Sequence, residues 1–531
     1  MLQVRCSETR MREFANPAHC QCSTTDPAFK QVVIIGNGPS GIILSYLLNG
    51  NLPYYNGSPH PDAMLTARLQ SATSPSLIEQ DLEFLSQGLE GRSNNPVSLL
   101  MDSLMHPSAD LGLEYPSVVK FEHSPDSSVD HVVIGKGAPG GIWQDMKKNL
   151  LTISLSSWMD LPGLTFQEWS SKNLNMKEPV KRVKAGKVAQ YFSDYVKKMK
   201  LCKYFKNHCT VTSVKRLKCS EVFSSCGQMV VSDEGLWLVS GFSNATHEPF
   251  RYITPRVVLA TGTADVPNKL NVPGEPLYSW IKHDLASFEF DLNRKSKGCY
   301  LENEGKATVD PVLVVGSGLS AADAILLLRR LNAPIIHVFN QSSTSVLKSL
   351  SKSIYPDYQQ VWNLIHNSEN EHDGYQKLPD HQILDFTSRN NHHYVQIASP
   401  DGKVLRKKIS SAVILIGSRP NLSFLPDFFQ EGKTLGVTSN EPIDCRKNPL
   451  NLNPWTHKVV NAPPALYALG PLAGDNFVRF LLGGAVAVLC HIHDESKRQA
   501  VRIRTQAFCK SHTWCESRPE SCLTFMVWFI L

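Results

Sequence analysis

The sequence lacks the cysteine patterns of zinc sites and redox dithiols. Its 13 cysteines are scattered over 531 residues, no Cys-x-x-Cys occurs, and the closest pair is Cys20 and Cys22. Zinc ligation and dithiol redox chemistry both use closely spaced cysteines. We therefore expect no metal site, and the sequence disfavours a disulfide reductase.

Long hydrophobic runs are also lacking. No stretch of about 18 apolar residues occurs, and the apolar segment from Cys522 to Leu531 is too short to span a bilayer. The first residues show no apolar core behind a charged start, as a signal peptide would. These absences predict a protein that is not transmembrane and is cytoplasmic, with reduced thiols.

The signatures of other function classes are missing as well. No Ser-His-Asp, HExxH or P-loop pattern indicates a hydrolase or a kinase. The net charge of +6 is concentrated in residues 172–218, which hold 14 Lys and Arg against Glu178 and Asp194. This basic segment is either a solvated helical face or a surface for an acidic partner or anionic lipid. No aromatic interleaving or nucleic-acid motif supports DNA or RNA binding.

Two glycine-rich loops stand out in what the sequence does contain. Val32–Ile35 is followed by Gly36-Asn37-Gly38-Pro39-Ser40-Gly41, and Val312–Val315 by Gly316-Ser317-Gly318-Leu319-Ser320-Ala321. In such a loop the first glycine permits a tight turn, the second lets the backbone approach a pyrophosphate, and the third small residue packs helix against strand. The phosphates then lie at a helix N-terminus. The pair of loops predicts two dinucleotide sites.

The second unit is compact, whereas the first is interrupted. After the second loop a helix at Ser320–Leu331 and a strand at Ile335–Phe339 follow at the spacing of a dinucleotide fold. After the first loop the next strand pattern is His131–Ile134. Between them, Val97, Leu100, Met101, Leu104 and Met105 have the spacing of an amphipathic helix, which predicts an inserted subdomain at about 51–128.

Three further strands complete the pattern. They are expected at Val257–Ala260, Ala412–Ile416 and Leu466–Leu469. A second unit inserted inside the first, with the chain returning at the end, explains this order. The sequence therefore predicts an α/β fold with two Rossmann-like dinucleotide-binding domains, one nested within the other.

Four local motifs follow the first loop in an ordered set. They are Gly140-Gly141-Ile142-Trp143, Trp158–Pro162, Ala260–Gly262 and Gly470–Asp475. The set resembles the flavin-dependent monooxygenases, whose fold nests an NADPH domain within an FAD domain. Ile35–Ile42, Gly88–Ser93 and Gly470–Phe480 also resemble the oxidative stress-induced growth inhibitor family, its member 1 more than its member 2.

The resemblance implies a division of the chain by cofactor. The parts would be a flexible extension (1–29), an FAD-binding domain (30–265), an NADPH-binding domain (266–425), a return segment of the FAD-binding domain (426–490) and an atypical tail (491–531).

The resemblance also implies which residues contact the cofactors. FAD would be held at its pyrophosphate by the first loop and near its ring by later motifs, through Gly36, Gly38, Pro39, Ser40, Gly41, Gly140, Gly141, Trp143, Gly474 and Asp475. The alternatives are a core position for Trp143 and a surface turn for Asp475. NADPH would be held by Gly316, Ser317, Gly318, Ser320 and Ala321.

The sequence departs from the monooxygenase pattern where ribose is recognised. The strand His131–Ile134 is followed by Gly135-Lys136, where an FAD site usually has an acidic residue. Phe339 is followed by Asn340-Gln341, where arginine commonly pairs with the 2′-phosphate of NADPH. Because no Asp or Glu stands there either, NADPH is still favoured over NADH.

The monooxygenase signature Phe-x-Gly-x-x-x-His is also altered. Val272 replaces the Phe and Tyr278 replaces the His, while His283 comes later in the chain. His283, Tyr278 and Asp160 are the catalytic candidates. For His283 the alternative is a solvent-exposed side chain. Trp158, Met159 and Asp160 are expected to line the pocket, although packing explains the Trp and the Met equally well.

The implied activity is an FAD-dependent, NADPH-consuming monooxygenase that acts through a peroxyflavin on O2 and an unidentified substrate. A family role in oxidative stress, growth inhibition, cell death, differentiation and cytokinesis comes with the resemblance, as does a midbody location. Two alternatives remain open. One is a catalytically weak regulatory protein that binds partners, and the other is an NADPH oxidase that releases hydrogen peroxide.

Overall fold

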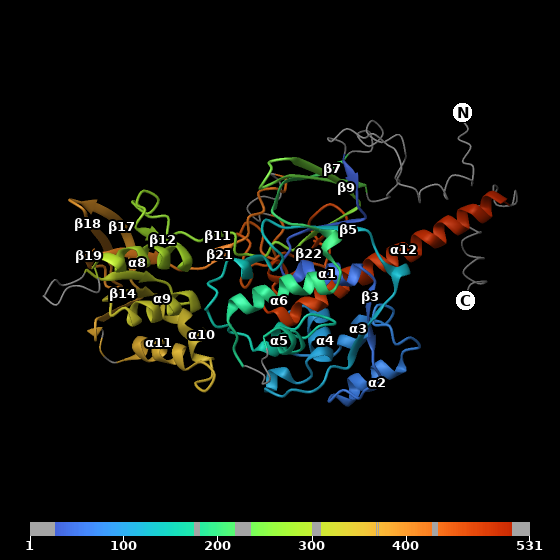
Figure 1. Ribbon diagram of the computed structural model, residues 1–531, viewed down its shortest axis with the longest axis horizontal. Helices are drawn as coiled ribbons and strands as arrows, with labels where there is room; N and C mark the ends of the chain where they lie inside the picture. The colour runs from blue at the N-terminus through green and yellow to red at the C-terminus, as the bar shows by residue number, and fades with distance from the viewer. Residues whose placement is uncertain are drawn as a thin grey trace.

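The computed structural model describes residues 27–174, 181–217, 235–299, 310–367, 369, 371–426 and 434–511. These residues form two α/β lobes, with the long helix α12 (Leu481–Ser511) running out of the first lobe (Figure 1). The predictions for residues 1–26 and 512–531 lie outside the described residues.

A five-stranded parallel sheet forms the centre of the first lobe. Its order is β22-β10-β2-β5-β6. The strands are β22 (Leu466–Ala468), β10 (Arg256–Leu259), β2 (Val32–Ile35), β5 (His131–Ile134) and β6 (Phe205–Lys206). Val32 and Ile34 of β2 enter one core cluster, and Val33 and Ile35 enter another, so both faces of the sheet are covered. Burial on both faces explains why these strands are continuous apolar runs.

Helices cover one face of this sheet and a second sheet covers the other. The helices are α1 (Pro39–Leu48), α4 (Pro96–Met105), α5 (Phe166–Leu174), α6 (Ala185–Lys198) and α12. The second sheet has the order β1-β9-β8-β7, from β1 (Ala28–Phe29), β9 (Pro249–Thr254), β8 (Leu236–Ser243) and β7 (Cys209–Leu217). This sheet was missed from the sequence.

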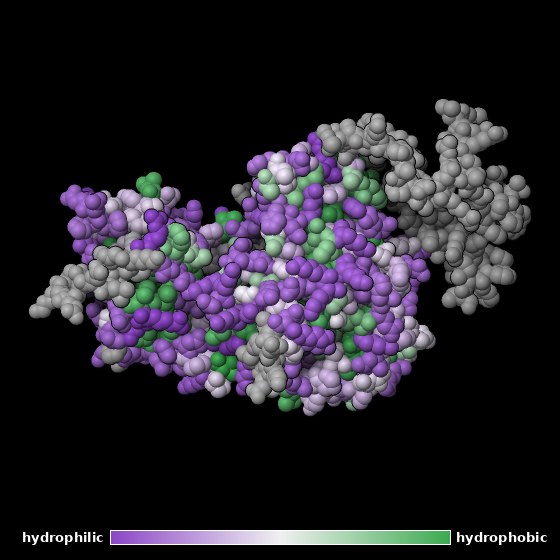
Figure 2. Space-filling view, viewed as in Figure 1, coloured by the Kyte–Doolittle hydropathy of each residue, from purple (hydrophilic) through white to green (hydrophobic). Residues whose placement is uncertain are grey.

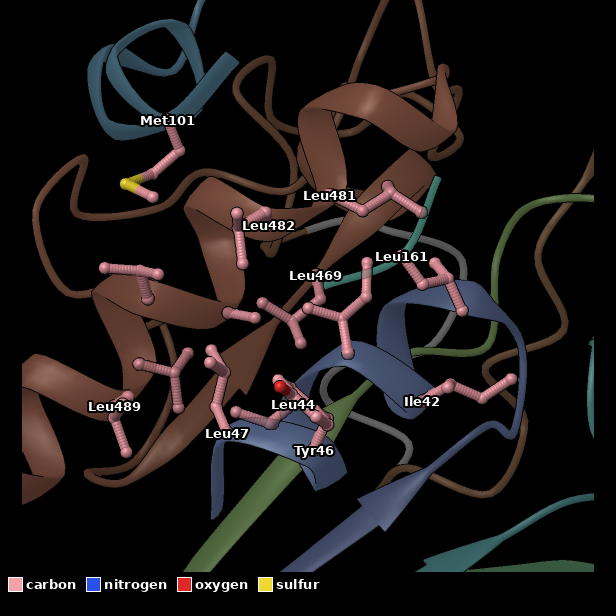
Figure 3. Packing of buried hydrophobic residues seen from close by; sticks show 14 of the residues in the cluster. Ile42, Leu44, Tyr46, Leu47, Met101, Leu161, Leu469, Leu481, Leu482 and Leu489 are labelled. Carbon is pink, nitrogen blue, oxygen red and sulfur yellow. The ribbon is translucent and has the colours of Figure 1, made fainter. Parts of the chain in front are cut away.

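The largest core cluster joins α1, α4 and α12 (Figure 3). Leu44 and Leu47 of α1 face Leu482 and Leu489 of α12. A Cβ atom at Gly483 would lie 2.3 Å from the Cα of Ser98, because α4 crosses α12 at this position. The return segment therefore packs on the first glycine-rich loop's helix and on the inserted subdomain together.

The inserted subdomain contains the predicted amphipathic helix and an antiparallel pair of strands that was not predicted. Val97, Leu100, Met101 and Leu104 are buried on α4, which confirms the helix. Strand β3 (Asn51–Tyr55) pairs antiparallel with β4 (Val119–His123). In the sequence α4 and two shorter helices, α2 (Ala63–Ser71) and α3 (Leu82–Ser86), lie between them. Strand β3 was not recognised in the sequence because it contains Pro53 and because its buried residues do not alternate with exposed ones.

The second lobe lies in the sequence between β10 and β22. Its six-stranded sheet has the order β12-β20-β13-β14-β16-β15, from β12 (Ile281–Lys282), β20 (Ser411–Ile414), β13 (Val312–Val315), β14 (Ile335–Phe339), β16 (Tyr375–Pro379) and β15 (Glu371–His372). Helices α8 (Leu285–Cys299), α9 (Leu319–Arg330), α10 (Ser345–Lys348) and α11 (Pro356–His366) complete it with the sheet β17 (Gln382–Arg389), β18 (His392–Ala398) and β19 (Val404–Ile409).

Two chain segments connect the lobes. They are β11 (Val266–Pro267) and β21 (Ser418–Arg419), which pair antiparallel between the lobes (Figure 1). The chain therefore enters and leaves the second lobe side by side.

Two predicted boundaries are wrong. Ala28–Phe29 does not belong to a flexible extension, because it pairs in parallel with β9 as strand β1. The boundary at residue 490 falls inside α12, which continues from the buried start of the helix without a break. Even so, none of the described helices has both the length and the apolar character needed to cross a membrane. On the face shown in Figure 2, hydrophobic residues are scattered among hydrophilic ones.

Candidate dinucleotide-binding sites

The first glycine-rich loop leaves β2 in a conformation that requires glycine. Gly36 has φ +117°, and a Cβ there would lie 2.1 Å from the carbonyl oxygen of Ala260. A Cβ on Gly41 would lie 2.1 Å from the carbonyl oxygen of Gly36. Gly38 is the N-cap of α1 and Pro39 follows it, with no side-chain cap and no acidic residue in the first turn. The amide groups at this helix start are therefore suited to an anion.

The loop at Gly140 and Gly141 lies directly against the first loop. The amide of Gly140 donates a hydrogen bond to the carbonyl oxygen of Asn37 at 2.8 Å. Gly141 has φ +58°, and a Cβ there would lie 3.0 Å from the Cα of Gly38. The buried Asn37 side chain donates to the Oδ1 atom of Asn207 at 2.9 Å. Two segments far apart in sequence thus form one backbone surface.

Trp143 follows this surface and is half-buried. Its ring meets the ring of Phe192 on α6 edge to face, with centroids 6.0 Å apart and planes at 78°. Next to it, the Nε2 atom of Gln144 donates to the carbonyl oxygen of Ala189 at 3.0 Å. Helix α6 therefore sets the orientation of the Trp143 ring. Its contact with a flavin remains a prediction.

The motif Gly470–Asp475 also lies against the N-terminus of α1. Gly470 has φ +65°, and a Cβ there would lie 2.3 Å from the Oγ atom of Ser40 on α1. The amide of Asp475 donates to the carbonyl oxygen of Gly470 at 3.1 Å, which closes the loop, and Gly474 has φ +88°. The structure thus brings the first loop, Gly140–Gly141 and Gly470–Asp475 together; a shared flavin site there stays a prediction.

The side chain of Asp475 forms its hydrogen bonds with the inserted subdomain. One carboxylate oxygen accepts from the Oγ atom of Ser93 at 2.5 Å, and the other accepts from Asn95 Nδ2 and Ser98 Oγ, each at 2.8 Å. The residue is 2% exposed, so the surface-turn alternative is wrong. Burial raises its pKa from 3.8 to about 6, although these hydrogen bonds act in the opposite direction. Asp475 therefore holds the start of α4.

A buried arginine that the sequence analysis missed strengthens this junction. The side chain of Arg479 is 1% exposed, lies 4.4 Å above the Trp158 ring, and pairs with Asp102 at 3.4 Å and with Asp110. Burial raises the pKa of Asp102 to about 7, despite the opposing charge of Arg479. The motifs Gly88–Ser93 and Gly470–Phe480, which carried the family resemblance, meet at this junction, because Arg92 also pairs with Asp110, at 3.2 Å.

The second glycine-rich loop repeats the geometry of the first. Gly316 has φ +133°, and a Cβ there would lie 2.2 Å from the carbonyl oxygen of Leu415. Gly318 is the N-cap of α9, again with no side-chain cap and no acidic residue in the first turn. A Cβ on Gly318 would meet nothing within 4 Å, so space lies open before the helix. Ala321 is buried, while Ser320 is exposed.

His337 fixes this second loop and was read in the sequence only as part of a strand. It is buried, with Nε2 2.7 Å from the carbonyl oxygen of Gly316 and Nδ1 2.6 Å from the Tyr375 hydroxyl. Burial lowers its pKa to about 4, so the ring is neutral at pH 7. Since a carbonyl only accepts, Nε2 carries the proton, and Tyr375 donates to Nδ1.

The two ribose positions differ from what the sequence analysis expected. After β5, Lys136 pairs with Asp265 at 2.9 Å. After β14, the amide of Gln341 donates to the Oδ1 atom of Asp380 at 2.9 Å, and the amide of Asp380 donates to Phe339 at 2.7 Å. An acidic residue is therefore present beside Asn340-Gln341, supplied by the end of β16. No local sequence signal marks it.

The side chains of the three catalytic candidates each contact another residue of the protein. His283 lies with its Nε2 atom 2.9 Å from the Oε1 atom of buried Glu275 and has a side chain 16% exposed, so the solvent-exposed alternative is wrong. Tyr278 stacks on Trp280, with centroids 5.4 Å apart. Asp160 accepts from the amide of Phe166 at the start of α5 at 2.7 Å, and burial raises its pKa to about 7. Each side chain has a structural partner.

A cavity of about 160 Å³, lined by both charged and apolar side chains, lies where the two lobes meet. Arg182, from the basic segment, pairs with Asp357 at 3.0 Å across it and lies 4.7 Å above the Tyr355 ring. Lys147 pairs with Glu289 at 2.5 Å. Arg182 is only 8% exposed, so the basic segment is not one solvated helical face.

Solved structures define the class of fold. The chain resembles the bacillithiol disulfide reductase from Staphylococcus aureus, with a TM-score of 0.53, 12% identity, and coverage of 88% of this chain and 99% of that chain. It also resembles the ornithine N-hydroxylase from Kutzneria sp. 744, with a TM-score of 0.50, 11% identity, and coverage of 88% and 100%. The chain therefore has the α/β fold of FAD- and NAD(P)-binding flavoproteins.

Curated relatives define the family. The human oxidative stress-induced growth inhibitor 2 is 41% identical over 481 residues, which cover 86% of this chain and 92% of the relative. The mouse oxidative stress-induced growth inhibitor 1 is 38% identical over 486 residues, with coverage of 88% and 96%. No protein-family model matches the chain. The chain belongs to the oxidative stress-induced growth inhibitor family, as the sequence motifs predicted, and the two identities do not distinguish its members.

Proposed function

We propose that this protein is an FAD-dependent oxidoreductase that consumes NADPH and transfers an oxygen atom from O2 to a substrate. One observation carries the proposal. Helices α1 and α9 each begin at the carboxyl edge of parallel strands, and the N-cap residue of each is a glycine, so no side chain caps the first amide groups. Ligands of open α/β sheets bind at that edge. Two such helix starts in one chain suit two dinucleotides.

The residues of the first lobe fit FAD. Gly36, Gly38 and Gly41 keep side chains away from the start of α1, where the pyrophosphate would bind. Gly140 and Gly141 add a second stretch of bare backbone beside it. Trp143 stands at the end of that stretch, where an aromatic ring would cover the flavin.

The residues of the second lobe fit a nicotinamide dinucleotide. The open space before Gly318 and the exposed Ser320 would receive its pyrophosphate, while His337 holds Gly316 in place. When bound, the two cofactors would supply hydride transfer to the flavin and its reaction with O2. In our assignment, residues 30–265 and 426–490 serve FAD, and residues 266–425 serve NADPH.

The chain's own part in such a reaction is to orient the two cofactors. Arg182 and Lys147 of the first lobe pair with Asp357 and Glu289 of the second. Lys147 follows the Gly140–Trp143 loop by four residues, so its pair with Glu289 ties the second lobe to the segment that carries this loop. Fixed geometry of this kind supplies much of the rate of a transfer between two bound groups.

Flavin reduction in a variant of the second loop tests the proposal. Gly318→Glu adds a carboxylate where a Cβ meets nothing within 4 Å, so folding and flavin retention should be unchanged. Repulsion between that carboxylate and a pyrophosphate should slow flavin reduction by NADPH at least about tenfold. Gln360→Glu, at an exposed position of α11 in the same lobe, adds the same charge without changing the backbone and is the matched control. An unchanged reduction rate in Gly318→Glu would show that the start of α9 does not bind the pyrophosphate of NADPH.

The fate of oxygen separates a monooxygenase from an oxidase. Hydrogen peroxide in a one-to-one ratio to the NADPH consumed would assign the oxidase alternative. A sub-stoichiometric peroxide yield that falls further when a substrate is added would support oxygen transfer.

A regulatory protein that keeps the fold is the second candidate. The observation in its favour is that His283, Tyr278 and Asp160 all have structural partners within the protein. Its relatives are named growth inhibitors, and we propose growth regulation in the cytoplasm, including cytokinesis at the midbody, as its cellular role. The exposed Lys197 and Lys198 at the end of α6 are candidates for its partner surface.

A further inference from the structure

The end of β14 is the position at which a dinucleotide fold recognises the adenosine ribose. Strand β16 pairs in parallel with β14, so that Phe339 lies opposite Pro379, and Asp380 comes next. The amide of Asp380 donates to the carbonyl oxygen of Phe339 at 2.7 Å. Strand pairing therefore places an acidic residue at this position, although it is distant in the sequence.

The carboxylate of Asp380 is held toward the loop that follows β14. Its Oδ1 atom accepts from the amide of Gln341 at 2.9 Å, and the residue has φ +55°. A carboxylate has two oxygens and about four acceptor positions, so Asp380 retains capacity to accept from a ribose hydroxyl. An exposed carboxylate held beside the loop that follows this strand suits an unphosphorylated ribose.

The three side chains that directly follow β14, Asn340, Gln341 and Ser342, carry no positive charge for a 2′-phosphate. Asn340 folds back on its own turn, since its Oδ1 atom accepts from the amide and the hydroxyl of Ser342 at 3.0 and 2.6 Å. His381 lies with its Nδ1 atom 2.7 Å from the carbonyl oxygen of Pro379. Among the described residues, no Lys or Arg forms an ion pair with Asp380.

We infer that Asp380 is a specificity residue of the second site, which accepts the ribose hydroxyls of NADH and repels the 2′-phosphate of NADPH. NADH is then an electron donor of this protein alongside NADPH, and Asp380 limits the advantage that NADPH would otherwise have. The inference rests on the proposed function, because it assigns the donor of the same site.

Binding of the oxidised dinucleotides to the FAD-loaded protein tests the inference by titration calorimetry. We expect the native protein to bind NAD⁺ at least as tightly as NADP⁺. Asp380→Asn keeps the shape of the side chain and removes its charge, so it should tighten NADP⁺ binding about tenfold, with a larger effect at low ionic strength. Asp401→Asn, an exposed carboxylate in the turn between β18 and β19, is the charge-matched control and should change neither affinity.

The outcomes separate this inference from the proposed function. NADP⁺ binding more than tenfold tighter than NAD⁺ in the native protein, or an unchanged affinity ratio in Asp380→Asn, would overturn the role of Asp380 alone. If neither dinucleotide binds and neither NADH nor NADPH reduces the flavin, the second site is not a dinucleotide site and the proposed function falls with the inference.

Discussion

Asp475 joins the return segment to the inserted subdomain, and truncating it should loosen α4. In Asp475→Ala, the donors on Ser93, Asn95 and Ser98 lose their shared acceptor inside the protein. A bond to a charged acceptor is worth about 1.5–3 kcal/mol. Burial of the charge, which raises the pKa of Asp475 to about 6 even though these hydrogen bonds lower it, offsets part of this energy. We expect a net loss of about 3 kcal/mol, as for other broken buried networks.

Asp475→Asn is the matched control for this prediction. Its amide oxygen can accept from Asn95 and Ser98, while its amide nitrogen donates to the Ser93 hydroxyl. The polar network is then kept and the buried charge removed, so the loss should stay below about 1 kcal/mol.

Amide hydrogen exchange measures the effect where it arises. In Asp475→Ala, exchange in α4 should be about 100-fold faster than in the native protein, since a loss of 1.4 kcal/mol corresponds to tenfold. Exchange in α9, in the other lobe, should not change. If α4 exchanges within about twofold of the native rate, or if Asn is as damaging as Ala, the carboxylate does not hold the inserted subdomain.

Three further predictions follow from the site. Because the pKa of Asp475 is raised to about 6 in the folded protein, the stability of α4 should fall as the pH rises from about 4 to 7; equal pH profiles in the native protein and Asp475→Asn would refute this. Gly38→Arg should abolish FAD retention, because the side chain would fill the space before α1, and stoichiometric flavin in the purified variant would refute that. Arg182→Met should slow flavin reduction about tenfold with flavin still bound, because the ion pair to Asp357 is lost; stopped-flow reduction at the native rate would contradict it.

The strands and glycine loops could be predicted because their signals are local. The apolar runs of β2, β13 and β14 are buried on both faces, and Gly36 and Gly316 need positive φ, so each leaves a mark in the sequence. The inserted α4 was likewise visible from its spacing.

Features that depend on pairing between distant segments could not be predicted. Asp380 reaches the end of β14 only because β16 pairs with it. Asp475 looked like a ligand residue or a turn residue, and only the packing of the inserted subdomain shows that its carboxylate is buried. The contact between His283 and Glu275 could not be predicted either, because the fold of the loop between them brings the two side chains together.

The central claim is that this chain binds FAD and that a nicotinamide dinucleotide reduces it. The visible spectrum of the purified protein under anaerobic conditions tests this most directly. Our account predicts a yellow protein, or one that becomes yellow when reconstituted with FAD, whose flavin absorbance bleaches on addition of NADPH. A protein that stays colourless after incubation with FAD, or flavin absorbance that neither NADPH nor NADH changes, would contradict it.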